Sequence, residues 1–174
     1  MMKDFIPFGD NNDMLRAEMP AYDFNDPENN APKLAIHLID QMKKHNGIGL
    51  AANQVGVKAR VFCMYSDPPM VCFNPKITAY GDEEVLLDEG CLSYPGVACK
   101  VKRPANIRVR FQDPYGNVVI KRFAGMAARV FQHELDHLDG VEYFNRANPI
   151  HKERFKRKWK KVFRTIKNRA KQAK

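Results

Sequence analysis

Apolar residues at helical spacing predict three helices in this chain. The first runs from Pro32 to about Lys44, with apolar positions at Leu34, Ala35, Leu38, Ile39 and Met42. Asn46-Gly47 is expected to end it, because glycine readily adopts the left-handed conformation that follows a helix. The second runs from about Ala124 to Leu138 and ends at Gly140, and its apolar side consists of Ala127, Val130, Phe131 and Leu135.

The third helix is expected to begin at Pro149, since the fixed φ of proline suits the first helical position and Asn148 can cap it. Its apolar residues lie at i, i+4, i+7, i+8 and i+11, as Phe155, Trp159, Val162, Phe163 and Ile166. They form one stripe on a helix whose other positions are mostly Lys and Arg.

The region between the first two helices has the pattern of β-strands. Short apolar runs bounded by Pro, Gly or Asp predict strands at 61–65, 71–74 and 84–87. A hairpin is the clearest element: apolar and polar residues alternate over 107–111, residues 113–117 form a turn, and 118–123 return. Residues 20–32 contain three prolines and are expected to form a loop.

Composition restricts the class of protein. A chain of 174 residues with 44% hydrophobic residues fits one domain with a real core. It has no apolar run of about 18 residues, so we expect no membrane-spanning helix. The N-terminal segment lacks a secretory apolar region and is acidic, unlike a transit peptide, so we expect a cytoplasmic location.

The net charge of +9 is concentrated at the C-terminal end. Residues 151–174 contain 12 Lys or Arg and one Glu, a net +11, whereas residues 1–150 have a net charge of −2. The basic helix is therefore either a solvated face whose apolar stripe packs on the body or a surface that docks to RNA, and both can hold together. A membrane surface is a third option that we rank lower.

The segment Gln132–His137 has the pattern H-E-x-x-H on the second helix. His133 and His137 are four residues apart, so both imidazoles project from one face and can bind one metal ion. Glu134, next to the first of them, is placed to act as a general base.

A catalytic site of this kind needs a third protein ligand. The downstream candidates are Asp139, Glu142, His151 and Glu153. The upstream candidate is Cys91, beside a glycine after a strand, and spacing alone does not choose between this cysteine and an acid. Cys63, Cys72 and Cys99 are expected to be small buried hydrophobic residues.

A third segment, Gly47–Gln54, combines two glycines and two alanines with a side-chain amide at Gln54. Alone it indicates only a Gly-Ala loop packed on a sheet. Together, however, Gly47–Gln54, Glu89–Ser93 and Gln132–His137 resemble the peptide deformylase motifs G-x-G-φ-A-A-x-Q, E-G-C-L-S and Q-H-E-x-D-H, in that order. The resemblance extends from Phe8-Gly9-Asp10 to Asp139–Tyr143.

The resemblance implies a metal-dependent hydrolase that removes the N-formyl group from N-formylmethionine of nascent polypeptides and releases formate. By similarity, Cys91, His133 and His137 bind the metal and Glu134 transfers the proton. Gln54 and the backbone N–H of Leu92 would stabilise the oxyanion. The substrate is expected to lie along Ile48, Gly49 and Leu50, and the apolar pocket for its methionine side chain is expected to use Ile48, Leu92 and Val130.

The same resemblance implies one divalent metal ion, usually Fe²⁺, although a Cys/His/His set also accepts Zn²⁺, Ni²⁺ or Co²⁺. It raises the expectation that the basic helix contacts the ribosome. We expect an α+β fold of short antiparallel β-sheets around the H-E-x-x-H helix. Residues 1–147 would form the catalytic domain, and residues 148–174 its helical extension. We expect a monomer, whose source is a bacterium, an organelle or a virus.

Two rival functions make different predictions. A metallopeptidase with an acidic third ligand would keep its metal in Cys91→Ala, whereas a deformylase would lose it. An RNA-binding protein with a purely structural metal site would not need Glu134 and would not turn over formyl-Met peptides.

Overall fold

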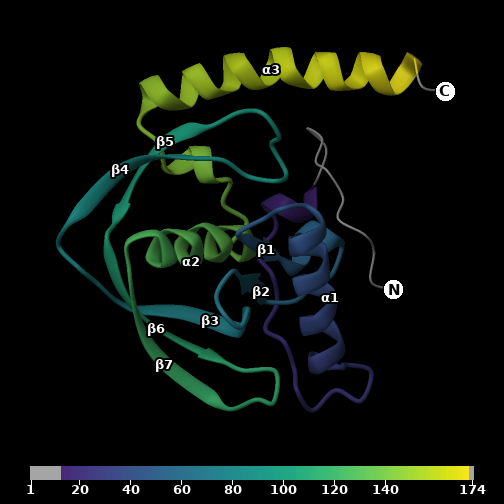
Figure 1. Cartoon of the computed structure of the whole chain (residues 1–174), viewed down its shortest axis with the longest axis vertical. Coiled ribbons are helices and arrows are strands. Elements are labelled where there is room, and N and C mark those ends of the chain that lie inside the picture. The colour runs from purple at the N-terminus through teal and green to yellow at the C-terminus, as the bar shows by residue number, and fades with distance from the viewer. Residues whose placement is uncertain (1–12, 173–174) are drawn as a thin grey trace.

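The computed structural model describes residues 13–172 (Figure 1). The segment Phe8–Asp10, part of the resemblance above, lies outside these residues. A 3₁₀ turn at Asp13–Arg16 leads to helix α1, Ala31–Lys44. The five-stranded sheet has the order β1-β2-β3-β6-β7, and all of its neighbours are antiparallel. Its strands are β1 (Gly49–Ala51), β2 (Val61–Met64), β3 (Met70–Tyr80), β6 (Asn106–Gln112) and β7 (Val118–Ala124).

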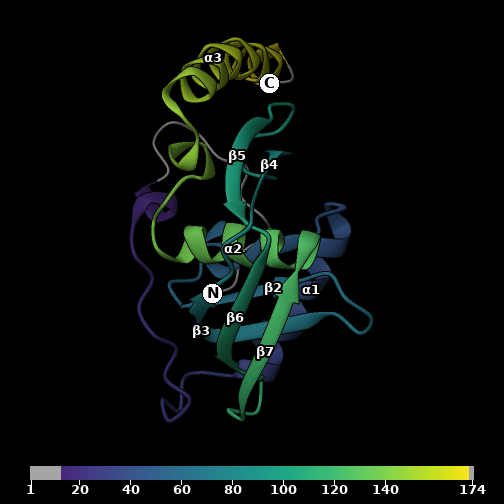
Figure 2. The ribbon, with the colours of Figure 1, turned by 90° about the vertical axis from the view of Figure 1, so that its left-hand side faces the viewer.

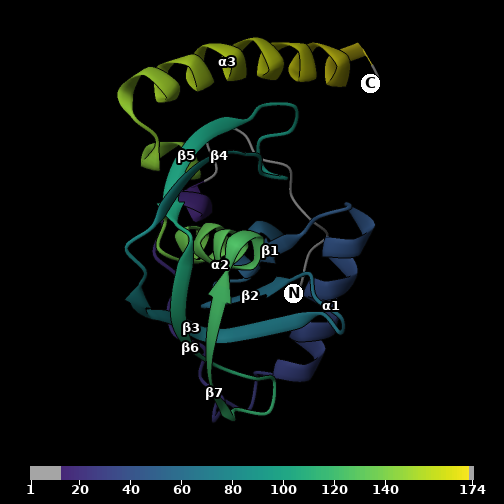
Figure 3. The same cartoon turned by 60° about the vertical axis from the view of Figure 1, so that its left-hand side comes forward.

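The remaining strands form a separate two-stranded sheet, β4 (Glu84–Glu89) with β5 (Cys99–Pro104). Helix α2, Gly125–Leu138, lies between the two sheets, and helix α3, Pro149–Gln172, lies across the far side of β4 and β5. Figures 2 and 3 show the same order of layers from two further directions. The α+β class with short antiparallel sheets is therefore confirmed.

Apolar side chains from these layers form three core clusters. One packs α1 on one face of β1, β2 and the start of β3, and another packs α2 on the opposite face of the five-stranded sheet. The third joins the segment after β4 to β5 and to α3 through Tyr94, Val101, Tyr143, Phe155 and Trp159. The apolar stripe of the third helix thus packs on the body as far as Phe163, whereas Ile166 is exposed.

The end of α1 differs from the prediction in one residue. The left-handed conformation falls on Asn46 (φ 53°), not on Gly47. The Gly47 N–H bonds to the Met42 carbonyl at 2.8 Å and the Asn46 N–H to Lys43 at 3.1 Å, as in a Schellman motif. Gly47 instead allows a close approach, because a Cβ there would lie 2.9 Å from Leu92 Cδ1 and 3.2 Å from the Gly49 carbonyl oxygen.

The strand predicted at 71–74 was too short. Strand β3 continues past Pro75 to Tyr80, although proline cannot donate a ladder hydrogen bond. Pairing with β2 ends at Phe73, and the register with β6 shifts between Phe73 and Lys76, so no ladder bond is required from Pro75. Strands β1 and β5 were not predicted.

Among residues 13–172, none of the helices combines the length and apolar character that crossing a membrane requires.

The division of the chain into a catalytic domain, residues 1–147, and a helical extension, residues 148–174, stays a prediction. The predicted caps are observed, since the Asn148 side chain accepts a hydrogen bond from the His151 N–H at 2.8 Å and Gly140 follows α2 with φ 68°.

Candidate functional site

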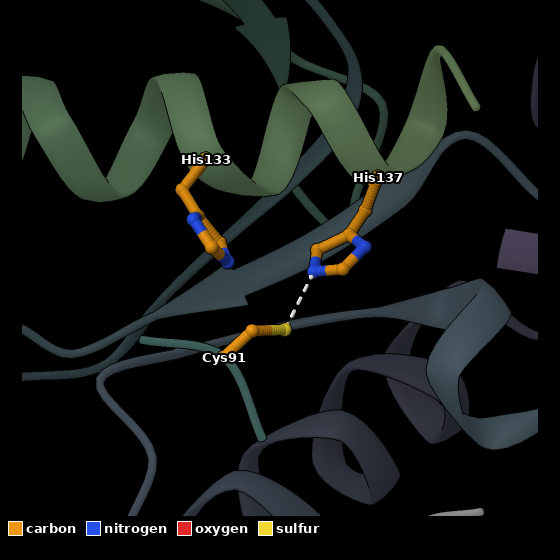
Figure 4. Close-up of side chains that lie close together, drawn as sticks. All are labelled: Cys91, His133 and His137. Carbon is orange, nitrogen blue, oxygen red and sulfur yellow. Dashed lines mark hydrogen bonds between the residues drawn. The ribbon is translucent and has the colours of Figure 1, made fainter. Parts of the chain in front are cut away.

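Three potential metal ligands converge between α2 and the end of β4. His133 and His137 project from the same face of α2, and Cys91 lies two residues beyond β4 (Figure 4). The Cys91 Sγ is 3.2 Å from His137 Nε2, and the donor atoms of all three residues lie within 4.8 Å of one another. In the described part of the chain this is the only such group of three or more His, Cys, Asp or Glu residues. One thiolate and two imidazoles suit a divalent transition metal.

The acidic alternatives for the third ligand are engaged elsewhere. Asp139 pairs with Arg60 at 2.6 Å. Glu142 accepts a hydrogen bond from the Tyr94 hydroxyl and pairs with Arg16 at 3.3 Å. His151 and Glu153 lie at the start of α3, outside the group of three.

The environment of Cys91 favours the thiolate, the form that binds metals. Burial opposes ionisation of the thiol, but the imidazoles of His137 and His133 outweigh it and hold the Cys91 pKa well below its usual range. The other three cysteines are buried and free, as predicted for small apolar residues.

Glu89 orients the first histidine. Its Oε2 lies 3.2 Å from His133 Nδ1, which leaves Nε2 of that ring for the metal. The carboxylate also accepts two hydrogen bonds from Arg103, at 2.7 and 2.9 Å. Burial opposes its ionisation, but His133 and Arg103 lower the Glu89 pKa to about 2, so it is a carboxylate at neutral pH.

Glu134 lies in the cavity wall beside the metal ligands. Its side chain packs against Gly49 so closely that a Cβ at residue 49 would lie 2.3 Å from Oε1. Its Oε2 is buried and has no hydrogen-bond partner. Burial raises the pKa of Glu134 to about 7, while the His133 and His137 imidazoles act in the opposite direction. A cation held by Cys91 and the histidines would lower it. A base whose pKa lies near neutrality is well suited to proton transfer.

The amide of Gln54 is fixed with its donor group towards the same region. Its Oε1 accepts the Ala51 N–H at 2.9 Å, and its Nε2 donates to Ser93 Oγ at 3.0 Å and lies 3.7 Å from Cys91 Sγ. Gln54 and Ser93 are both buried. The 3₁₀ turn at Ala52–Val55, directly after β1, therefore positions a side-chain N–H donor next to the candidate ligands.

A cavity of about 650 Å³ opens beside these groups. Its walls include Ile48, Gly49, Leu92 and Val130, so the structure brings these four predicted substrate contacts together. The prediction for Leu50 is not supported in the same way, because its side chain is fully buried in the core beside α1 and does not line the cavity.

Sequence reasoning missed several residues of the site. These are Glu89 as the acceptor for His133, Arg103 and Arg129 as its partners, and Met126 and residues 94–98 as cavity walls. The need of a histidine ligand for an acceptor on its other nitrogen could have drawn attention to Glu89. No local signal identifies the two arginines.

Comparison with known proteins agrees with this geometry. The family described as Polypeptide deformylase matches residues 2–153. The chain is 38% identical over 161 residues to a peptide deformylase of Thermotoga petrophila, covering 92% of this chain and 96% of that protein. It is 42% identical over 125 residues to one of Desulforudis audaxviator, covering 70% and 80%.

Solved structures give the same result. A plant peptide deformylase superposes with a TM-score of 0.85 at 31% identity, over 96% of this chain and 92% of that one. A peptide deformylase of Synechococcus elongatus in complex with actinonin has a TM-score of 0.80 at 32% identity, over 90% and 86%. With three motif segments meeting at one site and a family match over most of its length, the chain belongs to the polypeptide deformylase family.

Proposed function

We propose that this deformylase removes the N-formyl group from N-formylmethionine of nascent chains with one metal ion held by Cys91, His133 and His137. The ion, when bound, acts as a Lewis acid that lowers the pKa of water and polarises the formyl carbonyl. The observation that carries the proposal is Glu134 Oε2, a buried acceptor without a partner in the wall of the cavity that these ligands share.

In the proposed reaction Glu134 accepts a proton from the water whose oxygen bonds to the formyl carbon. Gln54 Nε2 and the Leu92 backbone N–H donate hydrogen bonds to the oxygen that becomes negative. Glu134 then passes its proton to the nitrogen as the C–N bond breaks, which releases formate and a free α-amine. Fixed donors of this kind contribute about 10²–10³ in rate each, and a general base about 10²–10⁴.

We further propose that the substrate backbone aligns with the outer edge of β1. Among residues 13–172 this strand is the last of its sheet and pairs with β2 alone, so its outer edge at Gly49 is available for strand addition. The apolar wall formed by Ile48, Leu92 and Val130 would receive the methionine side chain. A cavity of about 650 Å³ is of the size that binds small ligands.

The test of the reaction is formate release from formyl-Met-Ala-Ser by anaerobically prepared, iron-loaded protein. Turnover that is lost in Glu134→Gln and kept in Glu153→Gln, an exposed glutamate of α3, would support it. Wild-type rates in Glu134→Gln would overturn the assignment of the base. Actinonin, the ligand named for the Synechococcus elongatus relative, should compete with the substrate.

We propose Fe²⁺ as the native metal on the resemblance to the deformylase family, although a Cys/His/His set also accepts Zn²⁺, Ni²⁺ and Co²⁺. Metal analysis of anaerobically purified protein, with kcat/KM measured for each loaded form, tests this. Zinc as the main metal of the purified protein, or a zinc form more active than the iron form, would contradict it.

The basic helix α3 is proposed to contact ribosomal RNA. Its apolar stripe is turned to the body, and exposed lysines flank that stripe, among them Lys156, Lys160 and Lys167. Co-sedimentation with ribosomes should weaken steeply with salt and in the triple Lys→Gln variant at these positions. A matched variant removes three exposed lysines of the body: Lys33, Lys43 and Lys58. Equal losses in both variants, or no dependence on salt, would exclude specific docking through α3.

We also propose that the chain is a monomer and acts in the cytoplasm, where formylated nascent chains would emerge. Light scattering on the purified protein and fractionation of expressing cells test the two parts separately. A stable dimer would contradict the first part, and recovery from a membrane or organelle fraction the second.

A further inference from the structure

The sheet that delivers Cys91 is separate from the rest of the β-structure. In the part of the chain that the structure describes, strands β4 and β5 pair with each other alone, and an isolated pair of strands is marginally stable in water. Most residues of β4 are exposed, and Glu89 is its buried residue. Because Cys91 follows β4 by two residues, its distance from His133 and His137 depends on what holds this sheet against α2.

Arg129 makes one of the connections between the small sheet and α2, and Arg103 of β5, which binds Asp136 of α2 at 2.8 Å, makes another. Arg129 lies on α2 one turn before His133, and its side chain is buried. Its Nη1 donates to Glu89 Oε1 at 2.5 Å and to the Val101 carbonyl at 3.1 Å, and its Nη2 donates to the Val85 carbonyl at 2.5 Å. One guanidinium therefore binds both strands of the small sheet, including the last residue of β4.

The acceptors explain why an arginine is needed. Two are backbone carbonyls and one is a carboxylate, and they lie around one planar group. Arginine presents five N–H donors in a rigid fork, whereas lysine offers a single ammonium centre. A lysine at residue 129 keeps the charge but cannot bind all three acceptors from the same positions.

We propose that Arg129 is a positioning residue, which holds the end of β4 against α2 and so sets Cys91 at binding distance from His133 and His137. Arg129 is not among the three metal ligands and acts through Glu89 and the backbone of the small sheet. The inference rests on the proposed metal site.

The inference predicts a change in metal affinity. Partners that orient metal ligands typically contribute about 10–100-fold in affinity. We therefore expect Arg129→Met to bind Co²⁺ about 10–100-fold more weakly than the wild type. We also expect a weaker cobalt–thiolate charge-transfer absorption, because the thiolate of Cys91 would be less well placed. Arg129→Lys should be intermediate in both measurements.

The experiment titrates Co²⁺-loaded full-length protein with a chelator and follows the thiolate absorption. Arg146→Met is the matched control, since Arg146 belongs to the same ionic network but contacts Asp136, at 2.7 Å, instead of Glu89. Circular dichroism and thermal unfolding of each protein show whether it is folded. If Arg129→Met does not fold, Arg129→Lys decides the question.

Weaker Co²⁺ binding in the Arg129 variants, with Arg146→Met like the wild type, supports the positioning role. Wild-type affinity in Arg129→Met, or in Arg129→Lys where the methionine variant is unfolded, overturns it, as does an equal loss in Arg146→Met. A wild-type protein that binds Co²⁺ without any thiolate absorption would instead refute Cys91 as a ligand.

Discussion

Gly49→Ala should reduce deformylase activity by displacing Glu134, without removing any group that takes part in the chemistry. A Cβ at residue 49 would lie 2.3 Å from Glu134 Oε1 and 2.8 Å from both Cδ and Cγ. Strand β1 cannot easily give way, because Leu50 and Ala51 are fully buried in the two cores on either side of the sheet. Glu134 can give way, since its Oε2 has no hydrogen bond that would hold it.

The magnitude follows from the distance. Ordinary contact begins near 3.4 Å, so the carboxylate must move by about 1 Å to accommodate the new methyl group. A displacement of about 1 Å at a reacting group costs about 10²-fold in rate, which corresponds to about 2.7 kcal/mol of activation free energy. Complete loss of the base would set the upper limit, at about 10²–10⁴-fold.

The assay is formate release from formyl-Met-Ala-Ser, with the metal content measured on the same preparation. We expect kcat to fall about 10²-fold in Gly49→Ala while one metal per chain is retained, because the three ligands are untouched. Gly81→Ala is the comparison: its Cβ would meet Asn106 Cβ at 3.1 Å, outside the active-site cavity, so kcat should be unchanged. A fully metallated Gly49→Ala enzyme with wild-type kcat would refute the reasoning.

Three further results are expected. Phe155→Ala should lower the free energy of unfolding by about 3–5 kcal/mol in urea titrations, because the ring is buried in the third cluster. Exposed Ile166→Ala should change it by less than about 0.5 kcal/mol, and an equally small change in Phe155→Ala would show that α3 does not stabilise the body. Gln54→Ala should lower kcat about 10²–10³-fold with little change in KM, and a change in KM alone would assign Gln54 to substrate binding instead. Tyr143→Phe should destabilise the fold by about 1–3 kcal/mol, since the Val97 carbonyl loses its 3.1 Å hydrogen bond, and an unchanged urea midpoint would contradict this.

The helices were predictable from sequence because their burial is periodic. Leu34, Leu38 and Met42 recur on one face of α1, and each is buried where the pattern predicted it. Strand β1 is different, since all three of its residues are buried and no alternation distinguishes it from a loop. In β5 the alternation exists, but its third inward position is a charged residue, Arg103, which local pattern rules assign to the surface.

The same distinction applies to the site. Each of the three motif segments is local in sequence, so residue types and spacing are enough to indicate metal chemistry. The contacts that arrange the segments are not local. Arg103 and Arg129 reach Glu89 from positions 14 and 40 residues further along the chain. Which arginine meets which carboxylate depends on how the small sheet lies on α2, and no sequence spacing records this.

The link between α2 and the small sheet is largely ionic, and this fits what the site requires of it. Arg103 contacts Glu89, two residues before Cys91, and also Asp136, at 2.8 Å, directly before His137. Replacing buried ion pairs with apolar groups is often neutral for stability, so stability alone does not account for such a network. Apolar packing tolerates small shifts between layers, whereas charged hydrogen bonds to several fixed acceptors allow few arrangements. The ligand atoms of Cys91, from the segment after β4, and of the two α2 histidines must lie within 4.8 Å of one another. Charged hydrogen bonds between α2 and the small sheet fix this distance more closely than apolar contacts between them would.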